Sequence, residues 1–252
     1  MLQKVSYDER QHAQYQRGRA MPPDRLATWI DAFGTYAPSA RPLAVLDLGS
    51  GTGRFTPALA EAFGGPVYGV EPAEKMRAVA EKSAAHPAVT YLDGRAELIP
   101  LPAASIDLVL MYLSFHHIQD RGAAAAEIAR VLRPSGRLLL RSTFSDHMPE
   151  LEWMRYFPRA RDIEMRMFPS TGEVMRLFAT VRLSPVALVA IEEQLAPSLT
   201  EYAERLRLRA LSTFEHMSEE EIAQGFARMD VAVAEATQPR PVVRSSDLLV
   251  FG

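Results

Sequence analysis

Short apolar runs alternate with amphipathic segments along the first part of the chain. We predict strands at 43–48, 67–71, 89–92, 106–111 and 138–140, and helices at 54–63, 73–84 and 122–132. The sequence RPSG at 133–136 ends the last of these helices. Strands that alternate with helices indicate a parallel sheet, covered on both faces and joined by right-handed crossovers.

The segments on either side of this repeat are less regular. Before the first strand, an amphipathic helix begins at Pro22 and carries Trp29 and Phe33 on its apolar face. Residues 148–178 are rich in Met, Phe and Arg, and this predicts a cap with helices at 151–156 and 170–179. We expect a sixth strand at 186–192, helices at 198–214 and 218–234, and a seventh strand at 247–251 that closes the sheet.

Composition restricts the classes of function. A chain of 252 residues, 48% of them hydrophobic, can bury one substantial core and a modest cap. The formal net charge of -3 disfavours nucleic acid as a partner, which needs a basic surface. The absence of cysteine excludes thiolate metal ligands and thiol nucleophiles. A polar N-terminus and the lack of a long apolar run lead us to expect a cytoplasmic protein with no membrane contact.

Three glycines lie where the first strand meets the next helix, at the carboxyl edge of the predicted sheet. Gly49, Gly51 and Gly53 allow the positive φ angles of a tight turn and let backbone amides approach a ligand. A tight turn without a ligand explains the same spacing, so the neighbouring residues decide. A dinucleotide site needs a glycine three residues after Gly51, and Arg54 stands there, which disfavours NAD.

Glu71 is the second informative neighbour. It lies 20 residues after Gly51, at the end of the second strand, where a carboxylate can accept hydrogen bonds from both hydroxyls of a ribose. A solvated acidic residue at a strand end is the alternative. The combination favours a cofactor that contains a nucleoside.

These blocks resemble the class I S-adenosylmethionine-dependent methyltransferases, in the group that methylates small molecules (methyltransferase type 11-like). The resemblance covers about residues 40–142 and includes YLSFHH at 112–117 and EIARVLRPSG at 127–136. It implies an α/β fold, a Rossmann-like, doubly wound sheet of seven strands with helical cap insertions. We expect three parts: an N-terminal helical cap over the cofactor (1–40), the cofactor-binding core (41–145), and a helical lid with the last strands of the sheet (146–252).

The resemblance implies S-adenosylmethionine as the cofactor. In the family the first-strand motif holds the methionine part, the acidic residue holds the ribose, and the segment after the third strand frames the adenine. The family often has Asp where this chain has Arg95, so the backbone of Arg95 and Ala96 is expected to supply the adenine contact. Tyr15, Arg17 and Arg19 resemble a pattern that some relatives fold over the cofactor, and an exposed basic arm is the alternative. The expected cofactor-binding residues are Tyr15, Arg19, Asp47, Gly49, Ser50, Gly51, Gly53, Glu71, Pro72, Met76, Gly94, Arg95, Ala96, Glu97, Tyr112 and Ser114.

Methyl transfer from a sulfonium is an in-line displacement that needs alignment, exclusion of water and sometimes a base. His116 and His117 are the candidate catalytic residues, of which at most one should face the acceptor; a histidine that only shapes the pocket is the alternative. We find no paired-carboxylate pattern and expect no metal. The candidate acceptor-binding residues in the cap are Trp153, Tyr156, Phe157 and Phe168, with plain hydrophobic core as the alternative. Arg155, Arg159, Arg161 and Arg166 are interpreted as a solvated helix face rather than a site for an acidic group.

The predicted function is transfer of a methyl group from S-adenosylmethionine to a small-molecule acceptor. A hydrophobic cap favours a secondary metabolite or lipid-like acceptor, with carbon, nitrogen and oxygen all open as the methylated atom. Abundant arginine and alanine suggest a bacterial source, and we expect a monomer or homodimer. The alternatives are a nicotinamide-dependent oxidoreductase, disfavoured by the glycine spacing, and a non-catalytic S-adenosylmethionine-binding protein.

Overall fold

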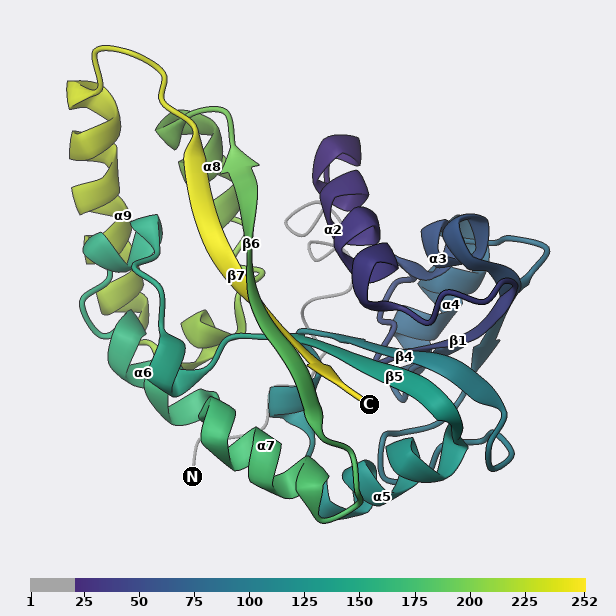
Figure 1. Cartoon of the computed structure of the whole chain (residues 1–252). Coiled ribbons are helices and arrows are strands. Elements are labelled where there is room, and N and C mark those ends of the chain that lie inside the picture. Colours follow the sequence, from purple (N-terminus) through teal and green to yellow (C-terminus); the bar gives the residue numbers. More distant parts are fainter. Residues whose placement is uncertain (1–20) are drawn as a thin grey trace.

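The computed structural model describes residues 21–252, and a seven-stranded sheet runs through their centre (Figure 1). The strand order is β3-β2-β1-β4-β5-β7-β6. β1 to β5 pair in parallel, whereas β7 is antiparallel to both β5 and β6. This confirms the predicted α/β class and the number of strands. The strands are β1 (Leu43–Leu48), β2 (Gly64–Val70), β3 (Val89–Leu92), β4 (Ile106–Tyr112), β5 (Leu132–Ser142), β6 (Pro185–Ala196) and β7 (Val242–Phe251).

Helices cover both faces of the sheet, which explains why the central strands are almost continuously apolar. On one face, α2 (Pro23–Tyr36) and α3 (Thr56–Phe63) bury Trp29, Phe33 and Phe63 against β1, β4 and β7. On the other face, α5 (Arg121–Val131) and α7 (Thr171–Ala179) contribute Ile128 and Phe178 to a second core. α4 (Glu74–Ser83) packs beside β3.

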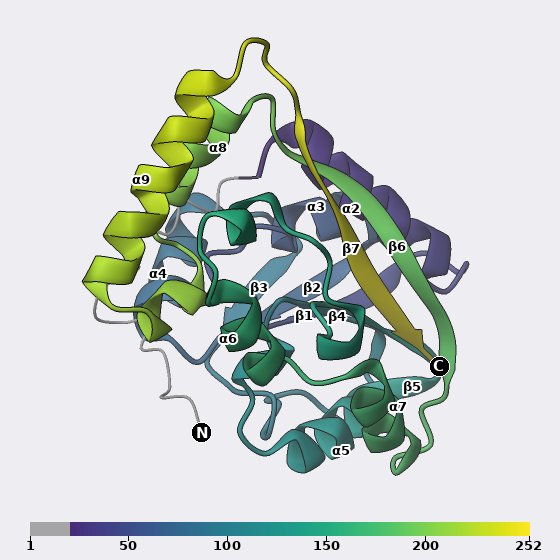
Figure 2. The same cartoon turned by 90° about the vertical axis from the view of Figure 1, so that its left-hand side faces the viewer.

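A third hydrophobic core lies in the cap, which includes residues 199–235 in addition to the predicted segment 148–178. The antiparallel pair of β6 and β7 extends beyond the rest of the sheet, and α8 (Leu199–Leu206) and α9 (Glu219–Glu235) lie along this extension (Figures 1 and 2). Trp153, Phe157, Phe214 and Phe226 are buried together in the cap with the ends of the two strands. The remaining elements are α6 (Ala160–Met167) and the short 3₁₀ turns η1 (Phe115–His117), η2 (Ser145–His147), η3 (Glu152–Arg155) and η4 (Ser212–His216).

The second half of the chain departs from the predicted elements. The helix expected at 151–156 is only the 3₁₀ turn η3, and α6 follows where no helix was expected. The helix expected at 198–214 divides into α8 and η4, and Arg209 between them has a φ of 49°, which a helix does not allow. β6 and β7 are longer than their apolar runs because the two strands pair with each other along their whole length. β7 lies between β5 and β6, so β6 forms one edge of the sheet and β3 forms the other.

Candidate functional site

The turn between β1 and α3 has the backbone that its glycines predict. Gly49, Gly51 and Gly53 have φ angles of 78°, 57° and 76°, which confirms the expected positive dihedrals. A Cβ on Gly49 would lie 2.5 Å from the Cβ of Ser114, and one on Gly53 would overlap Tyr91. At Gly51 the nearest atom is the Cε of Met76, at 3.7 Å from such a Cβ. Gly49 and Gly53 therefore allow close packing, whereas a Cβ on Gly51 would meet Met76 only at ordinary contact distance, so its positive φ is the reason for glycine there.

Glu71 stands at the end of β2 and faces this turn. Its Oε2 accepts a hydrogen bond from the Gly51 amide at 2.9 Å, and its Oε1 accepts one from the Ala73 amide at 2.9 Å. Arg77 donates to the Glu71 carbonyl at 2.8 Å and fixes the segment from the other side. The prediction that the second strand brings a carboxylate to the glycine turn agrees with this geometry.

Asp47 lies beneath the turn rather than on its open side. The side chain is buried, and the hydroxyl of Thr56, at the start of α3, donates to its Oδ2 at 2.7 Å. Burial raises the pKa of Asp47 to about 6, since the charged form loses its hydration. Asp47 can therefore act on a cofactor only by shaping the turn between β1 and α3.

The other expected cofactor residues gather at the same edge of the sheet. Ser114 donates to the Leu48 carbonyl at 2.9 Å and ties the end of β4 to the end of β1. Met76 is buried beneath Gly51, while Pro72 is exposed beyond Glu71. After β3, Gly94 packs on Pro100, the Arg95 side chain is exposed and Ala96 is buried, with Glu97 half-buried and Ser50 buried beside the turn.

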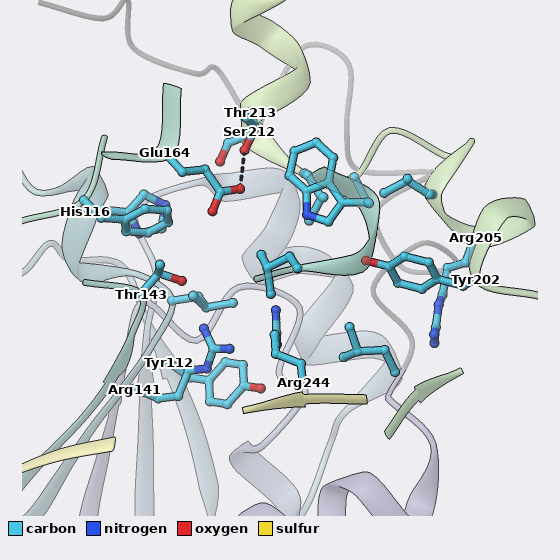
Figure 3. Close-up of a pocket in the computed structure, with 18 of the residues that line it drawn as sticks. Tyr112, His116, Arg141, Thr143, Glu164, Tyr202, Arg205, Ser212, Thr213 and Arg244 are labelled. Atoms are coloured by element: carbon cyan, nitrogen blue, oxygen red, sulfur yellow. Dashed lines mark hydrogen bonds between the residues drawn. The ribbon is translucent and has the colours of Figure 1, made fainter. Parts of the chain in front are cut away.

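A cavity of about 130 Å³ lies between the ends of β4 and β5 and the cap (Figure 3). Trp153 and Phe168 line it, as two of the four expected acceptor residues. Phe157 instead packs between Phe214 and Phe226 in the cap core, with ring centroids 5.3 and 5.2 Å away. Tyr156 lies outside the cavity lining and donates from its hydroxyl to Glu152 at 2.8 Å. For Phe157 the structure agrees with the hydrophobic-core alternative.

The two candidate catalytic histidines have different surroundings. Both lie on η1 after β4, with ring centroids 3.8 Å apart. His116 lines the cavity and packs against the ring of Phe168, at 4.5 Å between centroids, whereas His117 is not part of the lining. Of the two histidines, only His116 thus lines the cavity.

Sequence reasoning missed Arg141 and Arg244 in this cavity, and it interpreted Arg205 as part of a solvated helix face. Arg141 of β5 and Arg244 of β7 reach it from within the sheet, and Arg205 reaches it from α8 (Figure 3). Behind them, the buried Glu193 of β6 accepts from Arg244 at 2.6 Å and from the indole of Trp29 at 3.0 Å. Arg141 directly follows the apolar run of β5, and this charge within a strand was the sequence signal that could have revealed the cavity. The four arginines considered earlier, Arg155, Arg159, Arg161 and Arg166, are exposed as expected.

Some expectations concern residues that the structure does not describe. Tyr15, Arg17 and Arg19 lie outside the described residues. Within residues 21–252, no three His, Asp or Glu side chains are grouped so as to hold a metal ion. In the same part of the chain, every helix is too short or too polar to cross a membrane.

Sequence comparison places this geometry among methyltransferases. Residues 46–140 match the family described as methyltransferase domain. An uncharacterized methyltransferase of Mycobacterium tuberculosis is 40% identical over 141 residues, which cover 56% of this chain and 53% of that protein. One from Bacillus subtilis is 31% identical over 148 residues, 56% of each chain. The chain therefore spans about half the length of the curated relatives that it matches.

Solved structures share the fold. A protein from Anabaena variabilis, assigned as a methyltransferase from an antibiotic biosynthesis pathway, superposes with a TM-score of 0.73 at 21% identity and covers 90% of this chain and 97% of its own. A SAM-dependent methyltransferase from Aquifex aeolicus superposes with a TM-score of 0.56 at 21% identity and covers 71% and 92%. The family match identifies residues 46–140 as a methyltransferase domain, and the solved structures show that the fold around it is shared with methyltransferases, a SAM-dependent one among them.

Proposed function

We propose that this protein transfers the methyl group of S-adenosylmethionine to a small-molecule acceptor held between the cofactor and the cap. One observation carries the proposal. In the left-handed glycine turn after β1, the Gly51 amide donates to the carboxylate of Glu71, and the cavity with His116 is lined by Arg54, which follows this turn, and by Tyr112 at the end of β4. Parallel α/β sheets bind their ligands at this edge.

The residues at the turn fit the cofactor. Gly51 has no side chain to separate its backbone from a ligand, and Glu71 beside it would accept from the ribose hydroxyls. The backbone of residues 94–97 borders the same edge and would frame the adenine. The bound cofactor supplies an electrophilic methyl group. The chain itself supplies alignment and, through the cap residues Trp153 and Phe168, exclusion of water.

We assign the role of base to His116, for an acceptor that loses a proton from oxygen or nitrogen. A histidine titrates near neutral pH, and His116 is the one that lines the cavity. Replacing His116 by Gln should lower kcat with the cofactor affinity intact, whereas His117→Gln should leave kcat within about threefold. Equal losses in both variants would favour a role in pocket shape for the pair.

The finer parts of the proposal concern the acceptor and the setting. The Anabaena neighbour, assigned to antibiotic biosynthesis, supports a secondary metabolite as the acceptor class. We also propose a bacterial, cytoplasmic protein that works as a monomer or homodimer, without nucleic acid or membrane. A non-catalytic S-adenosylmethionine-binding protein is the competing function, and turnover of any acceptor would exclude it.

Calorimetric titration with S-adenosylmethionine, S-adenosylhomocysteine and NAD tests the cofactor directly. We expect micromolar binding of the two adenosyl ligands and none of NAD. Glu71→Ala should weaken that binding by about 1 to 3 kcal/mol, as for a charged hydrogen-bond partner. Glu81→Ala, on the exposed side of α4, is the matched control and should bind normally. NAD binding alone would refute the proposed function.

A further inference from the structure

Positive charge dominates the cavity. Among the described residues that line it, Glu164 is the single acidic side chain, against five arginines that come from different parts of the fold. The carboxylate of Glu164 is itself engaged, since Thr213 donates to it at 2.9 Å (Figure 3). The five are Arg25, Arg54, Arg141, Arg205 and Arg244.

Glu193 balances only part of this charge. It is fully buried behind the cavity and pairs with Arg25, with Arg244 at 2.6 Å and with Arg141 at 3.4 Å. One carboxylate thus faces three guanidinium groups, all of which are fully or largely buried. The strong attraction lowers the pKa of Glu193, so the carboxylate is ionised and can neutralise one of the three.

Arg141 has donors that nothing in the described part of the chain satisfies. The side chain is 1% exposed, and its Nη2 donates to Ser246 at 2.7 Å, but its Nε and Nη1 have no hydrogen-bond partner among residues 21–252. The buried hydroxyl of Tyr112 is equally unsatisfied, and the guanidinium carbon lies 5.2 Å from the centre of that ring. Burial lowers the pKa of Arg141 to about 10, which still leaves it charged at neutral pH. Buried unsatisfied donors of this kind are uncommon in native proteins, and a bound anion would satisfy them.

The size and walls of the cavity define the rest of the ligand. Its volume of about 130 Å³ is close to the ~150 Å³ of a cavity that binds benzene. Trp153 and Phe168 contribute apolar surface to the lining from the cap. Arg141, Arg244 and Tyr112 lie together on the sheet and form a charged floor (Figure 3). One small ring with one anionic group matches this division, and a neutral lipid-like acceptor does not.

We propose that the acceptor is a carboxylic acid of about single-ring size, whose carboxylate binds to Arg141, Arg244 and the Tyr112 hydroxyl beneath the cap. That the bound acid receives the methyl group rests on the proposed function, whereas the anion site itself is independent of methyl transfer. A carboxylate matches this site because its two oxygens suit the paired N–H donors of a guanidinium, and phenyl phosphate tests the other common anion. Charge-assisted bonds from guanidinium groups to a carboxylate are among the strongest in proteins.

Calorimetric titration of the full chain with benzoate, benzamide and phenyl phosphate tests the site without any turnover. Benzoate and benzamide share size and shape, so their difference reports the charge. We expect benzoate to bind at least about tenfold more tightly than benzamide, as a charged hydrogen-bonding group requires, and phenyl phosphate to bind no better than benzoate. Equal binding of benzoate and benzamide, no binding of either, or tighter binding of phenyl phosphate would overturn the proposal.

Tyr112→Phe is the sharpest variant, since it removes one unsatisfied donor and keeps the ring that packs on Trp29 and Phe55. Benzoate affinity should fall about tenfold in this variant, measured without cofactor so that no change in cofactor binding contributes. Arg161→Gln removes a charge from the exposed face of α6 and should bind benzoate like the unaltered chain. An unchanged affinity in Tyr112→Phe would refute the role of its hydroxyl.

A parallel titration with S-adenosylhomocysteine separates the two proposals. Benzoate binding without S-adenosylhomocysteine binding would refute the proposed function and leave the anion site standing. The converse result would refute the anion site and leave the methyltransferase function standing.

Discussion

The Cβ of Ser114 lies where a Cβ on Gly49 would have to go, because the two positions would be only 2.5 Å apart. This contact joins the turn after β1 to the end of β4, and the hydrogen bond from Ser114 to the Leu48 carbonyl closes the same junction. Gly49 also has a φ of 78°, which a residue with a Cβ adopts only with strain. The strand end and the turn can therefore meet only if residue 49 is glycine.

Gly49→Ala should lower the free energy of unfolding by about 2 to 4 kcal/mol, from the combined strain and overlap. Urea unfolding measures this, and S-adenosylhomocysteine binding should weaken in parallel. Gly34→Ala is the matched control, since a Cβ on Gly34 of α2 meets nothing within 4 Å. That variant should gain up to about 1 kcal/mol from helix propensity. Similar changes in both variants would contradict the explanation.

The apolar pattern predicted the core of the fold well for a physical reason. In β1, all six residues are buried, so burial on both faces leaves an apolar run that the sequence displays, interrupted only by Asp47. The glycine turn is also local, because φ angles at Gly49, Gly51 and Gly53 depend on those residues alone. Strand, turn and carboxylate at Glu71 could therefore be predicted within a short stretch of chain.

The charged floor of the cavity could not be predicted in this way. Glu193 and Arg244 face each other only through the register of β6 and β7, and Arg141 joins them because β7 enters the sheet beside β5. These pairings connect residues that lie far apart in sequence. An isolated arginine in an apolar strand indicates that something must compensate its charge, but it does not reveal the partner.

Stability should depend on pH through Asp47. Its pKa rises on folding from 3.8 to about 6, so between these values the native state binds more protons than the unfolded state. The free energy of unfolding therefore falls as the pH rises through this window. Asp47→Asn cannot titrate, and its stability relative to the unaltered chain should increase by ~2 to 3 kcal/mol from pH 4 to pH 6 and then stay level.

Thr56→Val provides the check on this assignment. The hydroxyl of Thr56 lowers the pKa of Asp47, so its removal should move the pH window upward in chemical denaturation measured across the same range. A constant difference between Asp47→Asn and the unaltered chain from pH 4 to pH 8 would show that another group is responsible.

Removing the charge of Glu193 should be costly. Glu193→Gln leaves Arg25, Arg141 and Arg244 without their shared carboxylate, and breaking a buried ion pair costs about 3 to 5 kcal/mol. The comparison is Asp230→Asn, which breaks the exposed pair with Arg207 and should cost no more than about 1 kcal/mol. Thermal and urea unfolding of both variants measure the difference, and a mild effect at Glu193 would mean that the arginines separate without it.

The cap should be separable from the cofactor turn in its response to mutation. A Cβ on Gly225 of α9 would overlap the ring of Phe157, which is buried in the cap core. Gly225→Ala should therefore destabilise the chain by about 1 to 3 kcal/mol, although alanine favours a helix. Phe157→Leu added to Gly225→Ala should recover part of the loss, because the two side chains compete for one space and their effects are not additive.

S-Adenosylhomocysteine affinity distinguishes a local effect on the cap from a general one. The cap core contains none of the residues around Gly51 or Glu71, so the cofactor should bind Gly225→Ala with unchanged affinity at a temperature where the variant is folded. Benzoate, which we place beneath the cap, should bind more weakly, since Trp153 belongs both to this core and to the cavity wall. A loss of cofactor binding equal to that of benzoate would show that the cap and the sheet edge respond as one unit.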